Sequence, residues 1–418
     1  MSLHEDMLLM GDRAVSAARS LALFSSRKKN NILEGMAAEL DARRDTLKQA
    51  NITDMDAGRS AGLSSAMLDR LQLTDARIEA MIKGIRDVMV LKDPVGTRIS
   101  RWMRPNGLEI QKIRVPIGVI AIIYESRPNV TADAAVLCFK ASNAVILRGG
   151  SEALQSNRAI AEALQVGGAK KGLPDYAVQL VGTTDRDVVR ELVQLEGRVD
   201  LAIPRGGEGL IRAVVEQASV PVIKHYKGVC HVYVDVSADF KMALDICENA
   251  KCQRPGVCNA IEKVLVHEKI AGQFLPQLVE RLTARKVELR GSEAVRALVP
   301  AMKPATESDW SKEYLDLILT VGLVKDVHAA AAHINRYGSH HSDAIIAADE
   351  APQKAFTEEV DSATVYVNAS TRFTDGGEFG MGAEIGISTD KLHARGPMAL
   401  EELTTYKYVI WGNGQVRK

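Results

Sequence analysis

The sequence has little of several features that mark particular classes of protein. Neither sign of charge is in excess, because Lys+Arg and Asp+Glu number 53 each in 418 residues. No basic field therefore attracts nucleic acid or an anionic membrane. No apolar run approaches the roughly 20 residues that a membrane-spanning helix needs. The opening segment, MSLHEDMLLM, lacks the basic-then-apolar order of a signal peptide. These absences predict a cytoplasmic protein that binds neither nucleic acid nor membranes.

Cysteine is scarce as well. The chain has 5 cysteines, an odd number that does not suggest a disulfide framework, so we expect reduced thiols. Cys247, Cys252 and Cys258 lie close in sequence, but zinc sites usually need CxxC pairs or histidines at helical spacing. No histidine lies between these cysteines, and His340 and His341 are adjacent, so they cannot both face one side of a helix or strand. The sequence therefore predicts no metal site.

What the chain does contain is typical of a globular protein with more than one domain. Hydrophobic residues make up 46% and charged residues 25%, and the length is enough for two or three cores. Apolar residues at helical spacing predict helices from about residue 8 to residue 90. The alternating segment 98–114 then turns at Asn106-Gly107, a signal for a type I′ hairpin. We expect this hairpin to project from its domain.

A regular alternation of strands and helices follows the hairpin. It predicts a parallel sheet with helices on both faces, and the chain enters a second α/β unit near Val236. The last residues, from about 404, are again strand-like. The strands expected in the first sheet are 117–124, 143–149, 177–182, 199–206 and 220–225.

Two glycine-rich turns in the first domain are candidates for phosphate binding. They are LRGGSEA (147–153) and PRGGEGL (204–210), each between a strand and a helix. Open parallel sheets bind ligands at the carboxyl ends of their strands, and helix N-termini favour anions. Neither turn fits G-x-G-x-x-G, so two ordinary connections remain an alternative. Arg148 would suit a ribose 2′-phosphate, which favours NADP over NAD.

The cysteines differ in their local setting. Cys138, Cys230 and Cys247 lie within apolar periodic segments, and Cys252 falls on the last turn of a helix, which suits buried side chains. Cys258 follows Pro255-Gly256 and precedes Asn259, so it belongs to a loop or a helix start. Backbone N–H groups there can lower a thiol pKa and bind an oxyanion. Position alone leaves nucleophile and core thiol both open.

Longer motifs give a family resemblance. The run NAKCQRPGVCNAIEKVLVHEKIAGQFLPQLVERL resembles the catalytic-cysteine segment of the aldehyde dehydrogenase superfamily, with Cys258 at the nucleophile's position. VPIGVIAIIYESRPNV resembles the first cofactor strand and substrate loop of that superfamily, and NAVILRGGSEA its adenosine-ribose strand. AIPRGGEGLI, EYLDLILTVGLV and TVYVNASTRFTDGGEFGMG resemble the nicotinamide-side turn, the segment of the ribose-binding glutamate and the late substrate loop.

The resemblance implies an α/β architecture with a Rossmann-type cofactor domain and a second α/β catalytic domain. The cofactor domain would comprise 1–97 and 115–235, and the catalytic domain 236–395. The small β elements 98–114 and 404–418 would mediate assembly into a homo-oligomer, a dimer or a tetramer. The cofactor implied is NADP, used as NADPH.

The same resemblance implies a set of site residues. Cys258 would be the nucleophile, Ser126 or Asn129 would supply the side-chain half of the oxyanion hole, and Arg127 and His225 would contact the substrate. No metal ligand is implied. The cofactor-binding residues implied are Lys140, Arg148, Gly149, Gly150, Ser151, Gly206, Gly207 and Glu313.

Further motifs point to one branch of the superfamily. YESRPNVTADA, GGSEALQSN, QRPGVCNA, HINRYGSHHSDAI and STRFTDGGEFGMGAEIGISTDKLHARGPM resemble the branch that reduces an acyl phosphate in proline biosynthesis. This implies NADPH-dependent reduction of γ-glutamyl 5-phosphate to glutamate 5-semialdehyde and phosphate through a cysteine thioester. It also admits association with glutamate 5-kinase, which makes the acyl phosphate.

Two departures from the wider superfamily agree with that chemistry. The window PVIKHYKG (221–228) lacks the general-base glutamate of the hydrolytic enzymes, and Lys224, His225 and Lys227 suit an anion better. An enzyme whose acyl partner is phosphate needs no base to activate water. In YESRP, Ser126 replaces the family's oxyanion asparagine, which leaves that half of the oxyanion hole open.

Three other functions remain as alternatives. A CoA-acylating or hydrolytic aldehyde dehydrogenase would differ in whether aldehyde oxidation requires phosphate, CoA or neither. A metal-dependent alcohol oxidoreductase such as histidinol dehydrogenase would be sensitive to chelators. A dinucleotide-binding protein without chemistry would lack a hyper-reactive thiol that substrate protects.

Overall fold

The computed structural model describes residues 2–417, which form two compact units. The first unit contains 2–224, 380–386 and 398–417, and the second contains 225–379 and 387–397. The predicted boundary near Val236 is therefore wrong by about one strand. The strand β7 (Cys230–Val234) pairs with β8 (Ile261–His267) and β12 (Ser342–Ile346), so its backbone hydrogen bonds bind it to the sheet of the second unit. The predicted segment 236–395 also loses 380–386 to the first unit.

From residue 2 onward, where the structure describes the chain, five helices form the N-terminal part of the first unit, as the helical spacing predicts. Four of them begin at a hydroxyl side chain that caps the first turn, namely Ser2, Ser25, Ser64 and Thr74. The remaining one starts directly after its predecessor without a side-chain cap. The helices are α1 (Leu3–Leu21), α2 (Ser26–Ala42), α3 (Arg44–Ser60), α4 (Ser65–Leu71) and α5 (Asp75–Val90).

The central sheet of the first unit has four parallel strands in the order β5-β4-β3-β6. The strands are β3 (Val119–Tyr124), β4 (Ala144–Arg148), β5 (Val178–Leu180) and β6 (Leu201–Arg205), with helices α6 (Asn129–Lys140), α7 (Leu154–Ala169), α8 (Asp187–Val193) and α9 (Glu208–Gln217). The direction of strand addition reverses beside β3, so a switch point lies at the carboxyl ends of β3 and β6.

The fifth strand expected in this sheet, at 220–225, does not form. Val222 makes a single isolated parallel bridge with Ala202. Pro221 accepts a hydrogen bond from the Ala202 N–H but has no N–H of its own to donate, so the ladder does not extend. This segment instead leads the chain out of the first unit.

The second unit is built on a seven-stranded sheet in the order β10-β9-β11-β8-β7-β12-β13, with every pairing parallel. The helices pack against the sheet in two sets, and an apolar core lies between each set and the sheet. Besides β7, β8 and β12, the strands are β9 (Glu288–Gly291), β10 (Lys303–Pro304), β11 (Ile318–Val324) and β13 (Thr364–Val367). The helices are α10 (Phe240–Cys252), α11 (Glu268–Ala284), α12 (Glu293–Leu298), α13 (Val327–Tyr337) and α14 (Glu350–Glu359).

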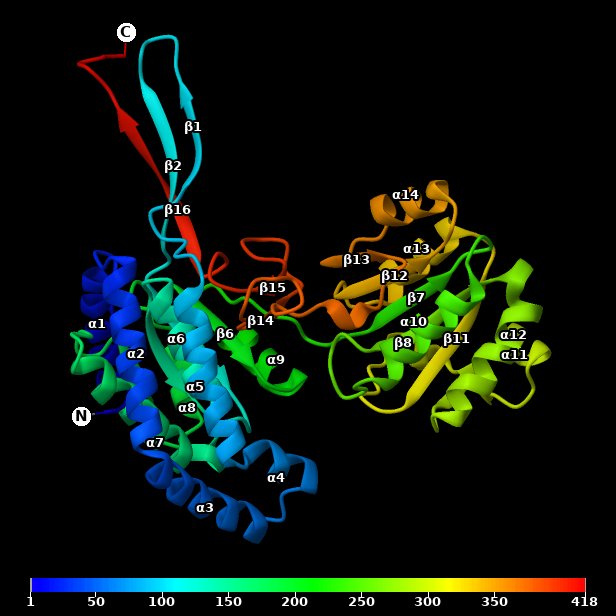
Figure 1. The fold of residues 1–418 in the computed structure, drawn as a ribbon, viewed down its shortest axis with the longest axis horizontal. Coiled ribbons are helices and arrows are strands. Elements are labelled where there is room, and N and C mark those ends of the chain that lie inside the picture. Colours follow the sequence, from blue (N-terminus) through cyan, green and yellow to red (C-terminus); the bar gives the residue numbers. More distant parts are fainter. Residues whose placement is uncertain (1, 418) are drawn as a thin grey trace. The chain divides into compact units, whose positions relative to one another are not determined.

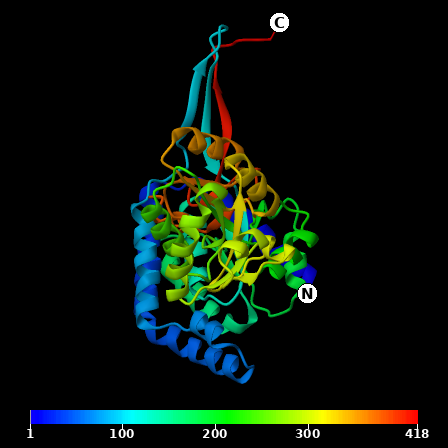
Figure 2. The same cartoon turned by 90° about the vertical axis from the view of Figure 1, so that its right-hand side faces the viewer.

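A three-stranded antiparallel sheet extends from the first unit. The hairpin β1 (Arg98–Met103) and β2 (Glu109–Pro116) pairs with the C-terminal strand β16 (Thr404–Trp411). Figures 1 and 2 show the cyan hairpin and the red strand side by side, reaching beyond the helices of that unit. The hairpin and the terminal strand expected from the sequence are therefore confirmed as elements, and they form one sheet. A separate two-stranded sheet joins β14 (Gly386–Ser388) and β15 (Gly396–Met398).

The turn of the hairpin differs from the type I′ turn expected at Asn106-Gly107. The Gly107 N–H donates to the Arg104 carbonyl and the Arg104 N–H to the Leu108 carbonyl, which gives a three-residue loop. Of the pair, Gly107 alone has a positive φ, +86°. Pro105, with its fixed φ, suits the second position of a type I turn, and the glycine then takes the left-handed position that follows.

Among the residues that the structure describes, no helix has both the length and the apolar character required to cross a membrane.

Candidate active site

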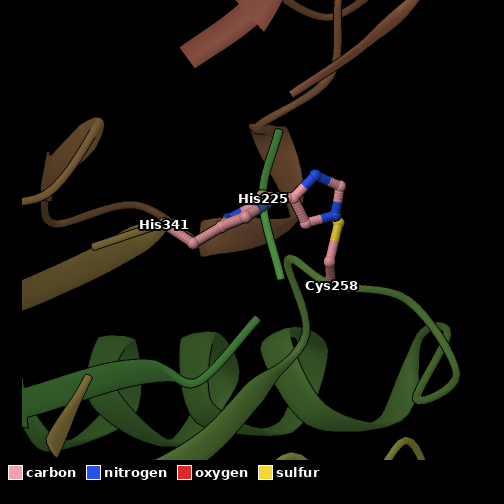
Figure 3. Close-up of side chains that lie close together, drawn as sticks. All are labelled: His225, Cys258 and His341. Carbon is pink, nitrogen blue, oxygen red and sulfur yellow. The ribbon is translucent and has the colours of Figure 1, made fainter. Parts of the chain in front are cut away.

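Three side chains meet at the amino-terminal edge of the sheet in the second unit. His225 precedes β7, Cys258 precedes β8 and His341 directly precedes β12. These three strands are neighbours in the order β8-β7-β12, and parallel neighbours bring the residues before them to one edge. The ligand-forming atoms of the three side chains lie within 4.8 Å of one another. Figure 3 shows the two imidazoles and the sulfur converging from separate segments.

Cys258 lies in a loop between the end of α10 and the start of β8 and is partly exposed. The loop is fixed by a close backbone approach on one side. A Cβ placed on Gly228 would lie 1.9 Å from the Cys258 carbonyl oxygen, so only glycine fits there. The same oxygen accepts a hydrogen bond from the Cys230 thiol at 3.1 Å. The loop predicted for Cys258 is confirmed, and its packing holds the thiol at the edge of the sheet.

The other cysteines have the surroundings of core residues. Cys138, Cys230 and Cys247 are buried, as expected, and Cys252 is half-buried at the end of α10. Burial raises the pKa of the thiols of Cys138, Cys230 and Cys252, and that of Cys247 to about 12. Within the described residues, none of the five cysteines is joined to another in a disulfide.

His225 presents one ring nitrogen to the thiol and uses the other to fix its orientation. Its Nδ1 lies 2.8 Å from the Ile387 carbonyl oxygen, an acceptor that requires a proton on Nδ1. Nε2 is then the unprotonated nitrogen of the neutral ring. Figure 3 shows this other nitrogen next to the Cys258 sulfur. The arrangement gives Cys258 a neighbouring base in the tautomer that can accept its proton.

His341 is fully buried behind the other two residues. Its Nδ1 lies 2.9 Å from the Ser342 hydroxyl oxygen and 3.8 Å from the Cys230 sulfur. Its Nε2 is buried and has no hydrogen-bond partner among the described residues. Burial, aided by repulsion from His225, lowers the pKa of His341 to about 3, so this imidazole is neutral near neutral pH. The ring packs edge-on against that of His225, with centroids 5.6 Å apart.

Positive charge lies beside the cysteine loop. Arg372, in the short helix η3 (Thr371–Phe373), donates to the side chains of Asn259 and Gln253. Burial lowers the pKa of Arg372, and nearby Arg254 lowers it further, while Cys258 raises it. The two guanidinium groups and the thiol therefore share one electrostatic environment, which suits an anionic ligand.

Glu313 is held at the same edge by a buried ion pair. Lys251 and Glu262 lie 2.8 Å apart, and both side chains are fully buried. Glu262 also accepts the backbone N–H groups of Tyr314 and Leu315 at 3.1 Å, which fixes the loop around Glu313. Glu313 in turn accepts the Gly228 N–H at 2.7 Å. Glu313 therefore joins the buried pair to the segment that carries His225.

A separate pocket of about 430 Å³ lies in the first unit, at the carboxyl ends of its strands. Arg148, Gly150 and Ser151, three of the predicted cofactor residues, line it, together with Glu125, Glu152 and Arg186. Arg148 donates to the carbonyls of Gly149 and Asp185, while its buried Nε has no partner in the part of the chain that the structure describes. Burial lowers the pKa of Arg148. An orphaned cationic N–H beside a pocket fits an anionic group of a nucleotide.

The glycine turns play different parts. A Cβ on Gly149 would lie 2.1 Å from Nδ2 of the buried Asn157, so a larger residue there would displace that side chain. One on Gly150 would lie 2.2 Å from Glu152 Oε1, the end of a flexible side chain that can move aside. In the second turn, the Gly207 N–H donates to Glu125 at 3.1 Å. The carboxylate of Glu125 thus takes the anion position at the start of α9. Gly206 and Gly207 are not among the residues that line the pocket.

Lys140 does not reach the pocket. Its side chain is buried, and Nζ donates to Asn30 Oδ1 at 2.6 Å and to the Met89 carbonyl at 2.9 Å. These bonds tie the end of α6 to α2 and α5. The expectation that Lys140 binds the cofactor is therefore not supported, because its ammonium group is committed to packing the helices.

The predicted oxyanion residues belong to the first unit. Ser126 has a positive φ of +50°, and its N–H and hydroxyl both donate to Glu152. A hydroxyl has one hydrogen, and here a carboxylate takes it. Asn129 donates one amide hydrogen to Asp133 at 2.8 Å. Arg127 is exposed.

The sequence prediction missed two parts of this site. His341 was set aside as a metal ligand because it adjoins His340, although the partners of His341 come from other strands. Arg372 was recognised only as part of a family-like segment. A signal for both exists in the sequence, since His341 stands directly before the buried strand β12 and Arg372 closely follows the strand β13. The order of the strands was needed to bring them to Cys258.

Comparisons with known proteins give a family and several relatives of this chain. The model of the aldehyde dehydrogenase family matches residues 4–316. A relative from Clostridium beijerinckii named gamma-glutamyl phosphate reductase is 54% identical over 412 residues, 99% of this chain and 100% of its own. A relative of the same name from Moorella thermoacetica is 55% identical over 408 residues, 98% of each chain.

Solved structures match as well. The crystal structure of gamma-glutamyl phosphate reductase from Thermotoga maritima has a TM-score of 0.97 and 49% identity, and the match covers 99% of this chain and 100% of that one. A glyceraldehyde-3-phosphate dehydrogenase from Methanocaldococcus jannaschii, complexed with NADP, has a TM-score of 0.69 and 16% identity over 98% of this chain and 95% of that one. The second likeness concerns the fold alone.

Proposed function

The chain belongs to the aldehyde dehydrogenase family, and within that family we propose that it reduces γ-glutamyl 5-phosphate to glutamate 5-semialdehyde and phosphate with NADPH. The predicted family and fold class are confirmed by the comparisons. The observation that carries the proposed reaction is the pairing of Cys258 with the unprotonated nitrogen of His225 beside two arginines. The names of the relatives support the substrate.

Cys258 begins the reaction as the nucleophile. His225 Nε2 takes the thiol proton, and the Ile387 carbonyl stabilises the ring as it becomes charged. The thiolate attacks the acyl carbon, the bond from that carbon to the phosphate oxygen breaks, and phosphate leaves with its electron pair. The product on the enzyme is a thioester of Cys258. The His225 side chain thus acts on the thiol, in place of the substrate contact that the resemblance implies.

NADPH, held by Arg148, Gly150 and Ser151 at the pocket of the first unit, would supply the hydride that reduces the thioester. The tetrahedral adduct on Cys258 then releases the aldehyde as its carbon–sulfur bond breaks and the thiolate is restored. The oxyanion of the adduct is stabilised by the Cys258 backbone N–H. Asn129 is the better side-chain candidate for the other half of the oxyanion hole, because the hydroxyl hydrogen of Ser126 is donated to Glu152.

The substrate is recognised by positive charge. It carries a phosphate, the leaving group, and a carboxylate, and Arg372 and Arg254 lie in the electrostatic environment of Cys258. A guanidinium group binds either anion through two parallel hydrogen bonds. Arg127, which is exposed, remains the further candidate for a substrate contact.

The pocket in the first unit fits the adenosine half of the cofactor. Its volume of about 430 Å³ and its arginines, Arg148 and Arg186, suit a ribose with a 2′-phosphate. The orphaned Nε of Arg148 is the observation that supports NADP over NAD. Glu313, tied to Gly228, retains its predicted role at the nicotinamide ribose.

The remaining predictions follow from this assignment. The first unit serves as the cofactor domain and the second as the catalytic domain. The sheet of β1, β2 and β16 carries exposed Trp102, Met103, Tyr408, Ile410 and Trp411, which supports assembly into a dimer or a tetramer. A cytoplasmic location and an association with glutamate 5-kinase remain predictions.

The reaction run in reverse tests the proposal. Glutamate 5-semialdehyde is oxidised with NADP, and formation of NADPH is followed with phosphate, with CoA or with neither. We expect oxidation with phosphate alone, and Cys258→Ala lowers kcat/KM by at least about a thousandfold. Cys252→Ala, the matched control at the end of α10, keeps activity within about twofold.

Three results would contradict the proposal. Oxidation without phosphate indicates a hydrolytic enzyme, and oxidation that needs CoA indicates an acylating one. Substantial activity in Cys258→Ala shows that Cys258 is not the nucleophile. The role of His225 is tested separately with His225→Asn, whose amide keeps a donor for Ile387 but lacks Nε2. We expect kcat of this variant to fall about a hundredfold. We also expect kcat to rise more steeply with pH above neutrality, because the thiol then has to lose its proton to solvent.

A further inference from the structure

His225, Cys258 and His341 have the donor set of a site for a soft divalent cation. Two imidazole nitrogens and one thiolate are ligands that Zn²⁺ prefers, and four-coordinate zinc often keeps one position for water. Among the described residues, these three side chains form the one group of at least three His, Cys, Asp or Glu residues placed to hold a metal ion. Nothing in the proposed reaction uses a metal.

His341 Nε2 is the observation that points to a ligand. This nitrogen is buried, lacks a hydrogen-bond partner within residues 2–417, and belongs to a side chain that is 0% exposed. A buried polar atom without a partner costs free energy unless something binds it. When Nδ1 donates to Ser342, Nε2 carries an unused lone pair. Figure 3 shows the ring of His341 extending toward His225.

The spacing allows the three ligands to close on one ion. Bond lengths of about 2.0–2.3 Å in a tetrahedral site place ligand atoms roughly 3.3–3.6 Å apart. The atoms here lie within 4.8 Å, so a shift of roughly one ångström completes the site. His225 and Cys258 are only partly buried, and rotation of their side chains supplies that shift. His341 provides the rigid third ligand from behind.

We propose that His225, Cys258 and His341 bind one Zn²⁺ reversibly and that the zinc-bound enzyme is inactive. Binding forms a zinc–sulfur bond and two zinc–nitrogen bonds, and the thiol proton leaves to solvent. The sulfur lone pair that would attack the acyl carbon is then held by the metal, as is the nitrogen that would accept the thiol proton. The geometry that makes the thiol reactive thus also makes it a metal ligand.

Zinc binding is measured directly and apart from activity. The wild-type protein, kept reduced with a phosphine, is dialysed against Zn²⁺, and bound metal is counted. We expect one zinc per chain, removed by a chelator with full recovery of activity. Co²⁺ in place of Zn²⁺ gives a thiolate-to-cobalt charge-transfer band in the near ultraviolet. Absence of that band, or more than one zinc per chain with no preferred site, overturns the proposal.

His341→Asn isolates the buried ligand. Asparagine keeps a group at the position of Nδ1 for Ser342 but lacks Nε2, and His341 has no part in the proposed reaction. We expect zinc to bind at least about tenfold more weakly to this variant, measured by dialysis without substrate. His340→Asn is the matched control, because that partly exposed neighbour lies outside the cluster, and its zinc affinity stays unchanged. Equal zinc inhibition of wild type and His341→Asn overturns the proposal.

A labelling experiment on the wild-type chain decides the matter if His341→Asn does not fold. Zinc protects Cys258 from alkylation, measured by mass spectrometry, while half-buried Cys252 is alkylated at an unchanged rate. Mg²⁺, a hard cation, protects neither thiol. Protection of both thiols, or protection by Mg²⁺, contradicts a site of soft ligands at Cys258. These readouts need no substrate, so they remain valid if the proposed reaction fails its own test.

Discussion

The two parallel sheets of this chain place functional groups at opposite edges. In the first unit, the pocket lies at the carboxyl ends of the strands, where Arg148 ends β4 and Ser151 begins the next helical turn. In the second unit, His225, Cys258 and His341 all precede their strands, at the amino edge. The first edge follows the general rule for open sheets. The second does not.

The difference follows from what each edge offers. A carboxyl edge faces helix N-termini, whose N–H groups and positive dipole ends favour a nucleotide's phosphates. At the amino edge of the second sheet, α10 and α13 end instead, at Cys252 and Tyr337. Helix C-termini carry carbonyl groups, which disfavour a thiolate. Basic side chains must therefore stabilise the thiolate of Cys258 at this edge. The basic groups present are His225, Arg254 and Arg372.

The largest expected contrast between the two edges concerns their glycines. Gly228→Ala would bring a Cβ to 1.9 Å from the Cys258 carbonyl oxygen, so the cysteine loop has to move. A misplacement of about 1 Å at a reacting atom costs about a hundredfold in rate, and we expect kcat to fall at least that far. Gly207→Ala at the other edge meets nothing within 4 Å and keeps full activity. Steady-state kinetics and thermal melting of both variants check this, and a fully active Gly228→Ala would contradict the geometry.

The next contrast is one of stability within the second unit. Glu262→Gln leaves Lys251 as an uncompensated buried charge, since both side chains are 0% exposed. Breaking such a pair costs about 3–5 kcal/mol. Lys241→Ala removes an ion pair on the surface of α10, with Lys241 84% exposed, and costs less than about 1 kcal/mol. Urea titrations compare the two. Equal midpoints would show that the Lys251–Glu262 pair does not stabilise the unit.

Most of the fold could be predicted from the sequence because the buried strands are apolar runs of the right length. β3, β4, β8 and β12 were all expected, with helices between them. The errors arose where local pattern and hydrogen bonding disagree. The segment 220–225 reads as a strand, but Pro221 cannot donate to a ladder. β7 reads as the end of the first sheet, and only its pairing with β8 and β12 assigns it to the second.

The site was predictable in part. The order of family-like motifs identified Cys258, and Arg148, Gly150 and Ser151 do line a pocket. The meeting of His225 and His341 with Cys258 depends on the strand order β8-β7-β12. β12 begins 75 residues after β8 ends. The local sequence pattern does not indicate that β12 pairs with β7. Lys140 was predicted to bind the cofactor, but its ammonium group bonds to α2 and α5. That role could not be foreseen because it depends on how the helices pack.

Stability should depend on pH in opposite directions in the two units. Burial raises the pKa of Asp133, in the first unit, to about 6, above about 3.9 in an unfolded chain. Its contribution is complete below about pH 4 and is lost as the pH rises through 6. Burial lowers the pKa of His333, in the second unit, to about 3, below about 6.5 when unfolded. Its contribution is complete above about pH 6.5 and is lost as the pH falls toward 3.

Two variants separate these effects. Asp133→Asn should stabilise the protein by about 2–3 kcal/mol near pH 8, from two pKa units at about 1.4 kcal/mol each, and leave it unchanged near pH 4. His333→Gln should weaken the loss of stability between about pH 6.5 and pH 5. Hydrogen exchange, read on peptides of each unit, assigns each change to its unit. A change of the same sign in both units would contradict this account.

The smallest expected effect is on the KM for NADPH, at the carboxyl edge of the sheet in the first unit. It tests whether this edge affects the reactivity of Cys258 at the other. Arg148→Gln removes the guanidinium whose Nε has no partner, so the KM for NADPH should rise about tenfold, the loss of one charge-assisted hydrogen bond. The KM for NADH and the value of kcat should change by less than about twofold. Arg186→Gln, at an exposed position of the same pocket, should raise the KM for NADPH less.

The rate at which Cys258 is alkylated should remain that of the wild type in both variants, because no described contact of Arg148 involves the cysteine loop. A slower alkylation would mean that the nucleotide edge also positions the thiol, and the two edges would then have to be treated as one site.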